Sequence, residues 1–158
     1  MLYIFDWDGT LCDSLALISE SIRASSQQLG LPVLSDQERK SIIGLGLSEA
    51  VSKLYPDLLS EGVESMVQAY RNNYISLSRQ APTQLYNGVE DVLDELKIRG
   101  HTLAVATGKS RAGLERVLTE LNMHHYFAHS RCCDETRSKP HPLMLNEILQ
   151  ESGMAPES

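Results

Sequence analysis

The chain has 158 residues, of which 42% are hydrophobic and 22% are charged, a balance typical of one globular domain or of one domain with a small insertion. Its formal net charge of −7, with no block of basic residues, argues against nonspecific nucleic-acid binding, which needs clustered lysine and arginine. No apolar run approaches the roughly 18 residues of a membrane span. Three cysteines and an N-terminus unlike a signal peptide favour a cytoplasmic location.

The first half of the chain begins with a strand and continues with helical patterns only. Residues 2–5 are apolar and stop at Asp6, which predicts a buried strand that ends in a tight turn. Ser35 and Glu38 form a capping-box pair at the start of one predicted helix. Apolar residues recur at helical spacing in four segments, about 15–29, 35–43, 48–54 and 63–77.

From residue 84 onward, helical and strand patterns alternate. The spacing of apolar residues predicts helices over about 89–96, 114–121 and 145–149, and strands over 102–106 and 126–130. This alternation is typical of parallel strands covered by helices. The sequence therefore predicts one α/β domain, made of residues 1–13 and 84–158, with an all-helical insertion over residues 14–83.

Polar residues follow each predicted strand, where it ends or in the loop beyond it. In chain order they are Asp6, Asp8, Thr10, Thr107, Gly108, Lys109 and Lys139. Ligands of open parallel sheets bind beyond the carboxyl ends of the strands. We therefore expect two carboxylates, hydroxyl groups and lysines to meet at one edge of the sheet.

These residue types suit a phosphate group held together with a divalent cation. Two unit charges about 4 Å apart interact by roughly 4 kcal/mol at an effective dielectric constant near 20, so carboxylates alone would repel a phosphoryl group. Mg²⁺ reverses that effect, and it typically binds one or two carboxylates with substrate phosphate and water. One carboxylate can attack phosphorus, and a second can donate and accept the proton. Gly9 permits close backbone approach, and Thr10 and lysine can hold phosphate oxygens.

Three motifs resemble those of the haloacid dehalogenase (HAD) superfamily. Residues 6–11 (DWDGTL) resemble the first motif, Thr107-Gly108-Lys109 the second and Lys139-Pro140 the third. Residues 13–14, 86–89 and 139–142 narrow the resemblance to the phosphoglycolate-phosphatase-like branch, in which a helical cap follows the first motif. The resemblance implies a Rossmann-like, HAD-like parallel-sheet core, with the cap at residues 14–83.

The resemblance also implies a role for each motif residue. Asp6 would be the nucleophile and Asp8 the general acid/base, while Asp6 and the main-chain carbonyl of Asp8 would bind Mg²⁺. Thr107 and the Gly108 amide would hold the phosphate, and Lys139 would neutralise charge on the nucleophile and the phosphoryl group. The loop Gly44-Leu45-Gly46 would reach over the site and help to select the substrate. The implied function is Mg²⁺-dependent removal of phosphate from a small phosphorylated metabolite, with no nucleic-acid or membrane partner.

One departure from the family concerns its fourth motif, which supplies further acidic metal ligands on the next strand. No such pattern follows Lys139, and Glu147 and Glu151 fall within a helical pattern instead. We therefore expect the C-terminal part of the core to be missing and the first strand to have an unpaired edge, which is an aggregation hazard. An alternative function is a truncated or degenerate member that binds phosphate or a partner without turnover.

Other sites are less compatible with the sequence. A nucleotide-binding P-loop ending at Gly108 would need glycine at position 103, where this chain has Leu103. A phospho-accepting receiver domain is disfavoured by the helical insertion and by Asp8. The spacing of His124, His125, His129, Cys132 and Cys133 is not that of a zinc site. We interpret Tyr70 and Tyr74 as packing residues, Arg71 as solvated, and Lys109 with Lys139 as phosphate contacts.

Overall fold

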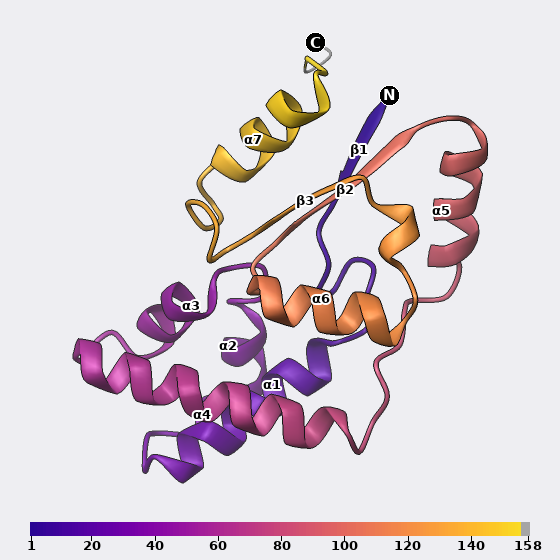
Figure 1. The fold of residues 1–158 in the computed structure, drawn as a ribbon. Coiled ribbons are helices and arrows are strands. Elements are labelled where there is room, and N and C mark those ends of the chain that lie inside the picture. Colours follow the sequence, from indigo (N-terminus) through magenta and orange to yellow (C-terminus); the bar gives the residue numbers. More distant parts are fainter. Residues whose placement is uncertain (156–158) are drawn as a thin grey trace.

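The computed structural model describes residues 1–155, which form seven α-helices, one 3₁₀-helix and three strands in that part of the chain (Figure 1). In chain order the elements are β1 (Leu2–Phe5), α1 (Leu15–Gln28), α2 (Asp36–Lys40), α3 (Leu47–Leu54), α4 (Ser60–Ser78), α5 (Val89–Ile98), β2 (Thr102–Thr107), α6 (Arg111–Glu120), η1 (His124–Tyr126), β3 (His129–Cys132) and α7 (Leu143–Ser152). None of these helices combines the length and apolar character needed to span a bilayer.

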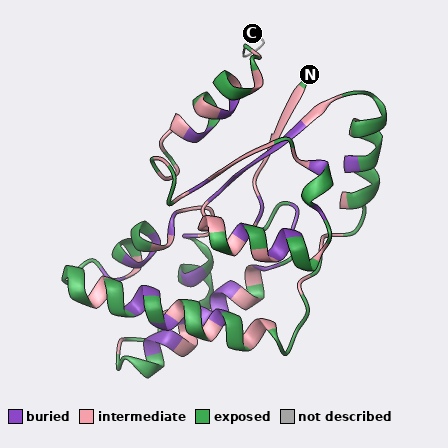
Figure 2. Ribbon diagram, viewed as in Figure 1, coloured by how far each residue is buried: buried purple, intermediate pink, exposed green. Residues whose placement is uncertain are grey.

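The three strands form a parallel sheet in the order β1-β2-β3, as the alternating pattern predicts. Leu2 is paired with Thr102, and Ala104 with His129. The central strand β2 is buried on both faces (Figure 2), which explains its continuous apolar sequence. Alternate β2 residues contribute to different hydrophobic clusters, Leu103 and Val105 to one and Ala104 and Ala106 to the other. The predicted α/β fold is confirmed.

Different helices cover the two faces of the sheet. Helices α5 and α6 contribute Leu93, Leu114 and Val117 to the larger cluster. Helix α7 contributes Met144 and Ile148 to the smaller cluster on the other face. Within residues 1–155, β1 is an edge strand that pairs only with β2. Helices α1–α4 lie beyond the carboxyl ends of the strands (Figure 1).

Helices α1–α4 have a hydrophobic cluster of their own. Its buried members lie between Ile18 and Tyr74 and include Ile22, Val51 and Met66, and α1 packs against α4. The capping box of Ser35 and Glu38 is confirmed at the start of α2. We propose that residues 14–83 form a cap domain inserted into a core of residues 1–13 and 84–158, and the separate clusters support this division.

The third strand lies further along the chain than predicted. It begins at His129 instead of residue 126, because Tyr126 belongs to the 3₁₀-helix η1. The Tyr126 ring is buried in the larger cluster and its hydroxyl donates a hydrogen bond to Asp94 at 2.7 Å. Apolar residues at 126 and 127 therefore pack in the core before strand pairing starts.

Leu93 tests the importance of the larger cluster for stability. Its side chain is fully buried, whereas the neighbouring Val92 is 54% exposed. Leu93→Ala is expected to lower the free energy of unfolding by roughly 2–5 kcal/mol, because it removes buried methyl groups and leaves a cavity. Val92→Ala is the matched control, with an expected change within about 0.5 kcal/mol. Urea denaturation measures both, and equal losses in the two variants would contradict the assigned burial.

Candidate active site

The turn after β1 carries Asp6 and Asp8, and the residue between them, Trp7, is completely buried. The Trp7 carbonyl accepts hydrogen bonds from the Leu11 and Cys12 amides, both at 3.0 Å. Gly9 has a φ of 80°, in the left-handed region that glycine adopts without steric cost. The sequence therefore folds here into a tight loop that fixes both carboxylates at the end of the strand.

Asp6 is paired with Lys139, which comes from the loop between β3 and α7. The Lys139 Nζ donates a hydrogen bond to Asp6 Oδ1 at 2.7 Å, although 133 positions separate the two residues. Thr107, the last residue of β2, is completely buried, and its Oγ1 accepts a hydrogen bond from the Lys109 amide at 3.1 Å. The first and third motifs therefore meet, as the parallel topology predicts.

One carboxylate oxygen of Asp8 accepts hydrogen bonds from two different side chains. Its Oδ1 accepts a hydrogen bond from Ser14 Oγ at 2.7 Å and from Lys109 Nζ at 3.1 Å. Burial alone would lower the pKa of Lys109, but the Asp8 carboxylate and the Tyr74 hydroxyl raise it above its ordinary value. The sequence predicts that Lys109 contacts phosphate, whereas the structure pairs it with Asp8.

The loop at Gly44–Gly46 packs directly on the core motifs. The Gly46 amide donates a hydrogen bond to Ser138 Oγ at 2.8 Å, next to Lys139. A side chain at Gly108 would overlap the Leu45 carbonyl oxygen and would lie 2.8 Å from the Gly44 carbonyl oxygen. Gly108 therefore gives the loop the space it needs to reach the second motif.

A cleft of about 720 Å³ separates the cap from the core motifs. Of the predicted site residues, Asp6, Asp8, Gly44, Leu45, Gly108 and Lys109 line it. Gly46, Thr107 and Lys139 contact lining residues, but Gly9 and Thr10 are exposed and do not line the cleft. The phosphate-binding role of Gly9 and Thr10 stays a prediction that this arrangement does not support.

Tyr70 and Tyr74, which were interpreted as packing residues, line the cleft together with Arg71, which was interpreted as solvated. Two cations lie over the Tyr74 ring. The Lys109 Nζ is 5.0 Å from the ring centroid, and the guanidinium carbon of Arg116 is 5.2 Å from it. Burial raises the pKa of Tyr74 and, more strongly, that of Tyr70, so both phenols are neutral at physiological pH. Sequence spacing places the tyrosines on one helix face but does not distinguish packing from a cleft wall.

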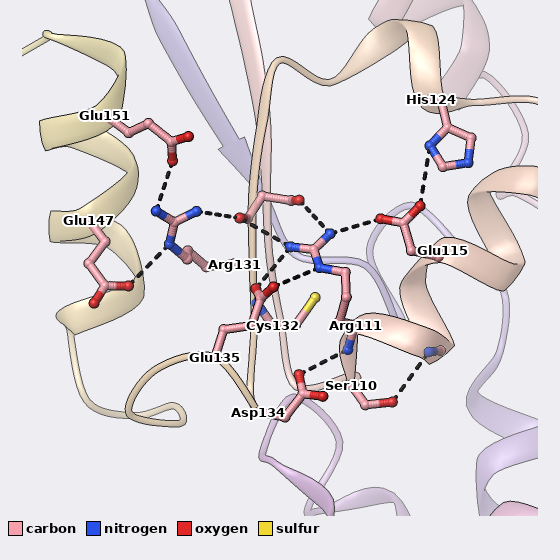
Figure 3. A network of polar contacts seen from close by, with 12 residues as sticks. Ser110, Arg111, Glu115, His124, Arg131, Cys132, Asp134, Glu135, Glu147 and Glu151 are labelled. Atoms are coloured by element: carbon pink, nitrogen blue, oxygen red, sulfur yellow. Dashed lines mark hydrogen bonds and ion pairs between the residues drawn. The ribbon is translucent and has the colours of Figure 1, made fainter.

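The loop that carries Lys139 is anchored by a network of charged residues (Figure 3). Arg111 on α6 binds both carboxylate oxygens of Glu135, at 2.8 and 2.9 Å, and also contacts Ser130 on β3. Arg111 lowers the pKa of Glu135, and Glu135 raises that of Arg111. Arg131 on β3 forms ion pairs with two carboxylates of α7, the helix that follows the loop, those of Glu147 and Glu151. The network joins α6, β3 and α7 and so restrains both ends of the Lys139 loop.

The oxygen donors after β1 are compatible with a hard divalent cation. Mg²⁺ typically takes one or two carboxylates and fills its remaining positions with water and substrate phosphate. The Asp6 carboxylate and the Asp8 main-chain carbonyl provide such donors. Within residues 1–155, no three histidine, cysteine or acidic side chains lie close enough together to form a metal site by themselves. Glu147 and Glu151 lie on α7 and form ion pairs with Arg131 of β3.

A protein-family model described as haloacid dehalogenase-like hydrolase matches residues 3–158. The chain belongs to this family. Phosphoglycolate phosphatase from Aliivibrio fischeri is 29% identical over 165 residues, covering 97% of this chain and 70% of that protein. The resemblance to the phosphoglycolate-phosphatase-like branch is therefore confirmed.

Two other comparisons agree with the family assignment. The tyrosine-protein kinase PtkA from Mycobacterium tuberculosis is 33% identical over 126 residues, covering 80% of this chain but only 42% of the kinase. A HAD-like family hydrolase structure from Streptococcus pneumoniae has a TM-score of 0.80 and 25% identity, covering 99% of this chain and 72% of that one. The chain thus spans between about two fifths and three quarters of the lengths of these relatives.

The buried pair of Lys109 and Asp8 gives a stability prediction. Their side chains are only 10% and 11% exposed, so Lys109→Met leaves a poorly solvated carboxylate without its cation. We expect the free energy of unfolding to fall by roughly 3–5 kcal/mol. The double variant Lys109→Met with Asp8→Asn should recover part of this loss. Urea denaturation measures the double variant and both single variants, Asp8→Asn included, with Lys53→Met on the exposed face of α3 as the control. Additive effects of the two substitutions would argue against direct coupling.

Proposed function

We propose that the protein is a Mg²⁺-dependent phosphatase that hydrolyses a small phosphorylated metabolite through an aspartyl-phosphate intermediate. The observation that carries the proposal is the position of Asp6 on the cleft, 2.7 Å from Lys139, with a second carboxylate two residues later. Similarity to phosphoglycolate phosphatase supports a phosphatase activity. We also propose a cytoplasmic location, which the small, odd number of cysteines supports.

In the first step, a carboxylate oxygen of Asp6 attacks phosphorus and the ester P–O bond breaks. Asp8 enters this step in its protonated form and donates its proton to the departing alcohol oxygen. Lys139 offsets the negative charge of Asp6 and of the phosphoryl group, while the Thr107 hydroxyl and the Gly108 amide hold phosphate oxygens. Mg²⁺ held by Asp6 and the Asp8 carbonyl would supply further charge neutralisation.

In the second step, water attacks the aspartyl-phosphate. Asp8, now a carboxylate, accepts a proton from that water, and the bond between phosphorus and Asp6 breaks. Inorganic phosphate leaves, and both carboxyl groups return to their starting protonation states. The hydrogen bonds of Asp8 to Ser14 and Lys109 hold its carboxylate beside the cleft, ready for this exchange.

Phosphate release from para-nitrophenyl phosphate tests the proposal. We expect release with Mg²⁺, loss of release with EDTA and recovery when excess Mg²⁺ is added. A homogeneous preparation that releases no phosphate with Mg²⁺, Mn²⁺ or Co²⁺ would favour the alternative, a member of the family that binds phosphate or a partner without turnover. Calorimetric titration with inorganic phosphate would then measure that binding directly.

A further inference from the structure

The cation beside Asp8 lies between that carboxylate and a tyrosine of helix α4. The Lys109 Nζ donates a hydrogen bond to Asp8 Oδ1 at 3.1 Å and a longer one to the Tyr74 hydroxyl at 3.5 Å. The same Nζ is 5.0 Å from the centroid of the Tyr74 ring. Lys109 follows β2 directly, whereas Tyr74 belongs to the helical segment inserted after β1. A residue of the inserted helices therefore contacts the cation that is paired with Asp8.

Tyr74 is well placed to fix the position of this cation. Tyr74 is 6% exposed and the Lys109 side chain is 10% exposed, so little water competes for the ammonium group. A lysine ammonium has three donors on a flexible stem, and contact with an aromatic face and a hydroxyl restricts its freedom. Arg116 on α6 lies over the same ring, so Tyr74 contacts two cations of the core. Without Tyr74, Lys109 would be free to turn from Asp8 into the cleft that it lines.

The hydrogen bonds on Asp8 leave one of its carboxylate oxygens available. Ser14 and Lys109 both donate to Oδ1, and within residues 1–155 no hydrogen bond reaches Oδ2. A carbonyl oxygen can accept two hydrogen bonds, whereas a protonated oxygen donates its own, so the proton of the acid form belongs on Oδ2. Lys109 therefore helps to determine which oxygen of Asp8 takes part in proton transfer.

We propose that Tyr74 is a positioning residue, which holds the Lys109 ammonium on Asp8 Oδ1 and so orients Oδ2 for proton transfer to the leaving alcohol. This inference rests on the proposed phosphatase function. Tyr74 acts through Lys109 and not on the substrate itself. Its removal should therefore matter most for substrates whose leaving group has to be protonated as it departs.

Two aryl esters of similar size test the proposal in the presence of Mg²⁺. Phenyl phosphate has a poor leaving group that needs the proton of Asp8, whereas para-nitrophenyl phosphate releases a stable phenolate that needs it much less. We expect Tyr74→Leu to lower kcat/KM by about 10- to 100-fold for phenyl phosphate, but by less than about threefold for para-nitrophenyl phosphate. Tyr74→Phe keeps the ring and loses only the hydroxyl, so a loss of about threefold is expected, for phenyl phosphate alone.

Tyr3→Phe is the matched control, because it removes a phenol hydroxyl on β1, outside the cleft. Its kcat/KM should be unchanged for both esters. Equal losses on the two esters in Tyr74→Leu would indicate a merely structural role, and unchanged values on both would indicate no role. Either result overturns the proposal.

A double-mutant cycle measures the contact between Tyr74 and Lys109 without turnover. In urea denaturation, the double variant Tyr74→Leu with Lys109→Met should lose less stability than the sum of the two single losses. If this coupling is found but the unmodified protein hydrolyses neither ester, the placement of Lys109 by Tyr74 is supported and the phosphatase proposal fails. Additive losses overturn the inference whatever the activity.

Discussion

Replacing Asp6 by asparagine is expected to lower kcat for phosphate release by on the order of 10⁴-fold or more, as loss of a covalent nucleophile does in other enzymes. The amide has nearly the same shape as the carboxylate and can still accept a hydrogen bond from Lys139. It is a far weaker nucleophile, however, and cannot form the acyl-phosphate. The loss should therefore fall on the chemical step, with little effect on folding. Initial rates with para-nitrophenyl phosphate and the urea midpoint measure these two quantities separately.

Borohydride trapping identifies the attacking residue independently of the rates. Reduction of an aspartyl-phosphate during turnover converts that aspartate to homoserine, which mass spectrometry of the peptide around residue 6 would detect. Asp57→Asn is the control, because Asp57 is exposed and outside the cleft. Full activity of Asp6→Asn, or homoserine at a different aspartate, would exclude the proposed nucleophile.

Replacing Gly108 by alanine should lower kcat/KM by about 100-fold, the loss that a displacement of roughly 1 Å can cause in an active site. The new methyl group would overlap the Leu45 carbonyl oxygen, so the loop at Gly44–Gly46 has to move away from the core. Gly108 does not have a positive φ, so alanine introduces no backbone strain, and the amide proposed to hold phosphate is retained. The substitution therefore tests loop docking separately from phosphate binding.

Gly62→Ala is the matched control for this second substitution. Gly62 lies in α4, also has no positive φ, and has the flexible Leu58 side chain as its nearest neighbour. We expect its kcat/KM to stay close to that of the unmodified protein. Steady-state kinetics and urea denaturation of both variants measure the effects, and unchanged kinetics in Gly108→Ala would mean that docking of the loop on Gly108 is not needed for turnover.

The sequence by itself determined the fold class and the edge of the sheet where the candidate site lies. Parallel strands joined by helices have their carboxyl ends at one edge of the sheet. Asp6 and Lys139 were therefore expected to meet although they are far apart in the chain, and the structure places them 2.7 Å apart. The start of the third strand was not predictable, because Tyr126 is apolar like a strand residue but packs in the core through a 3₁₀-helix.

Only the tertiary structure decided which long side chains face the site. Lys109 can extend in several directions, and its partner, Asp8, became known only once the second motif and the turn after β1 were placed together. Tyr70 and Tyr74 have the periodicity of packing residues, and the same periodicity describes a helix face that lines a cleft. The cleft itself arises where the cap meets the core, so its lining depends on contacts between segments that local sequence patterns do not encode.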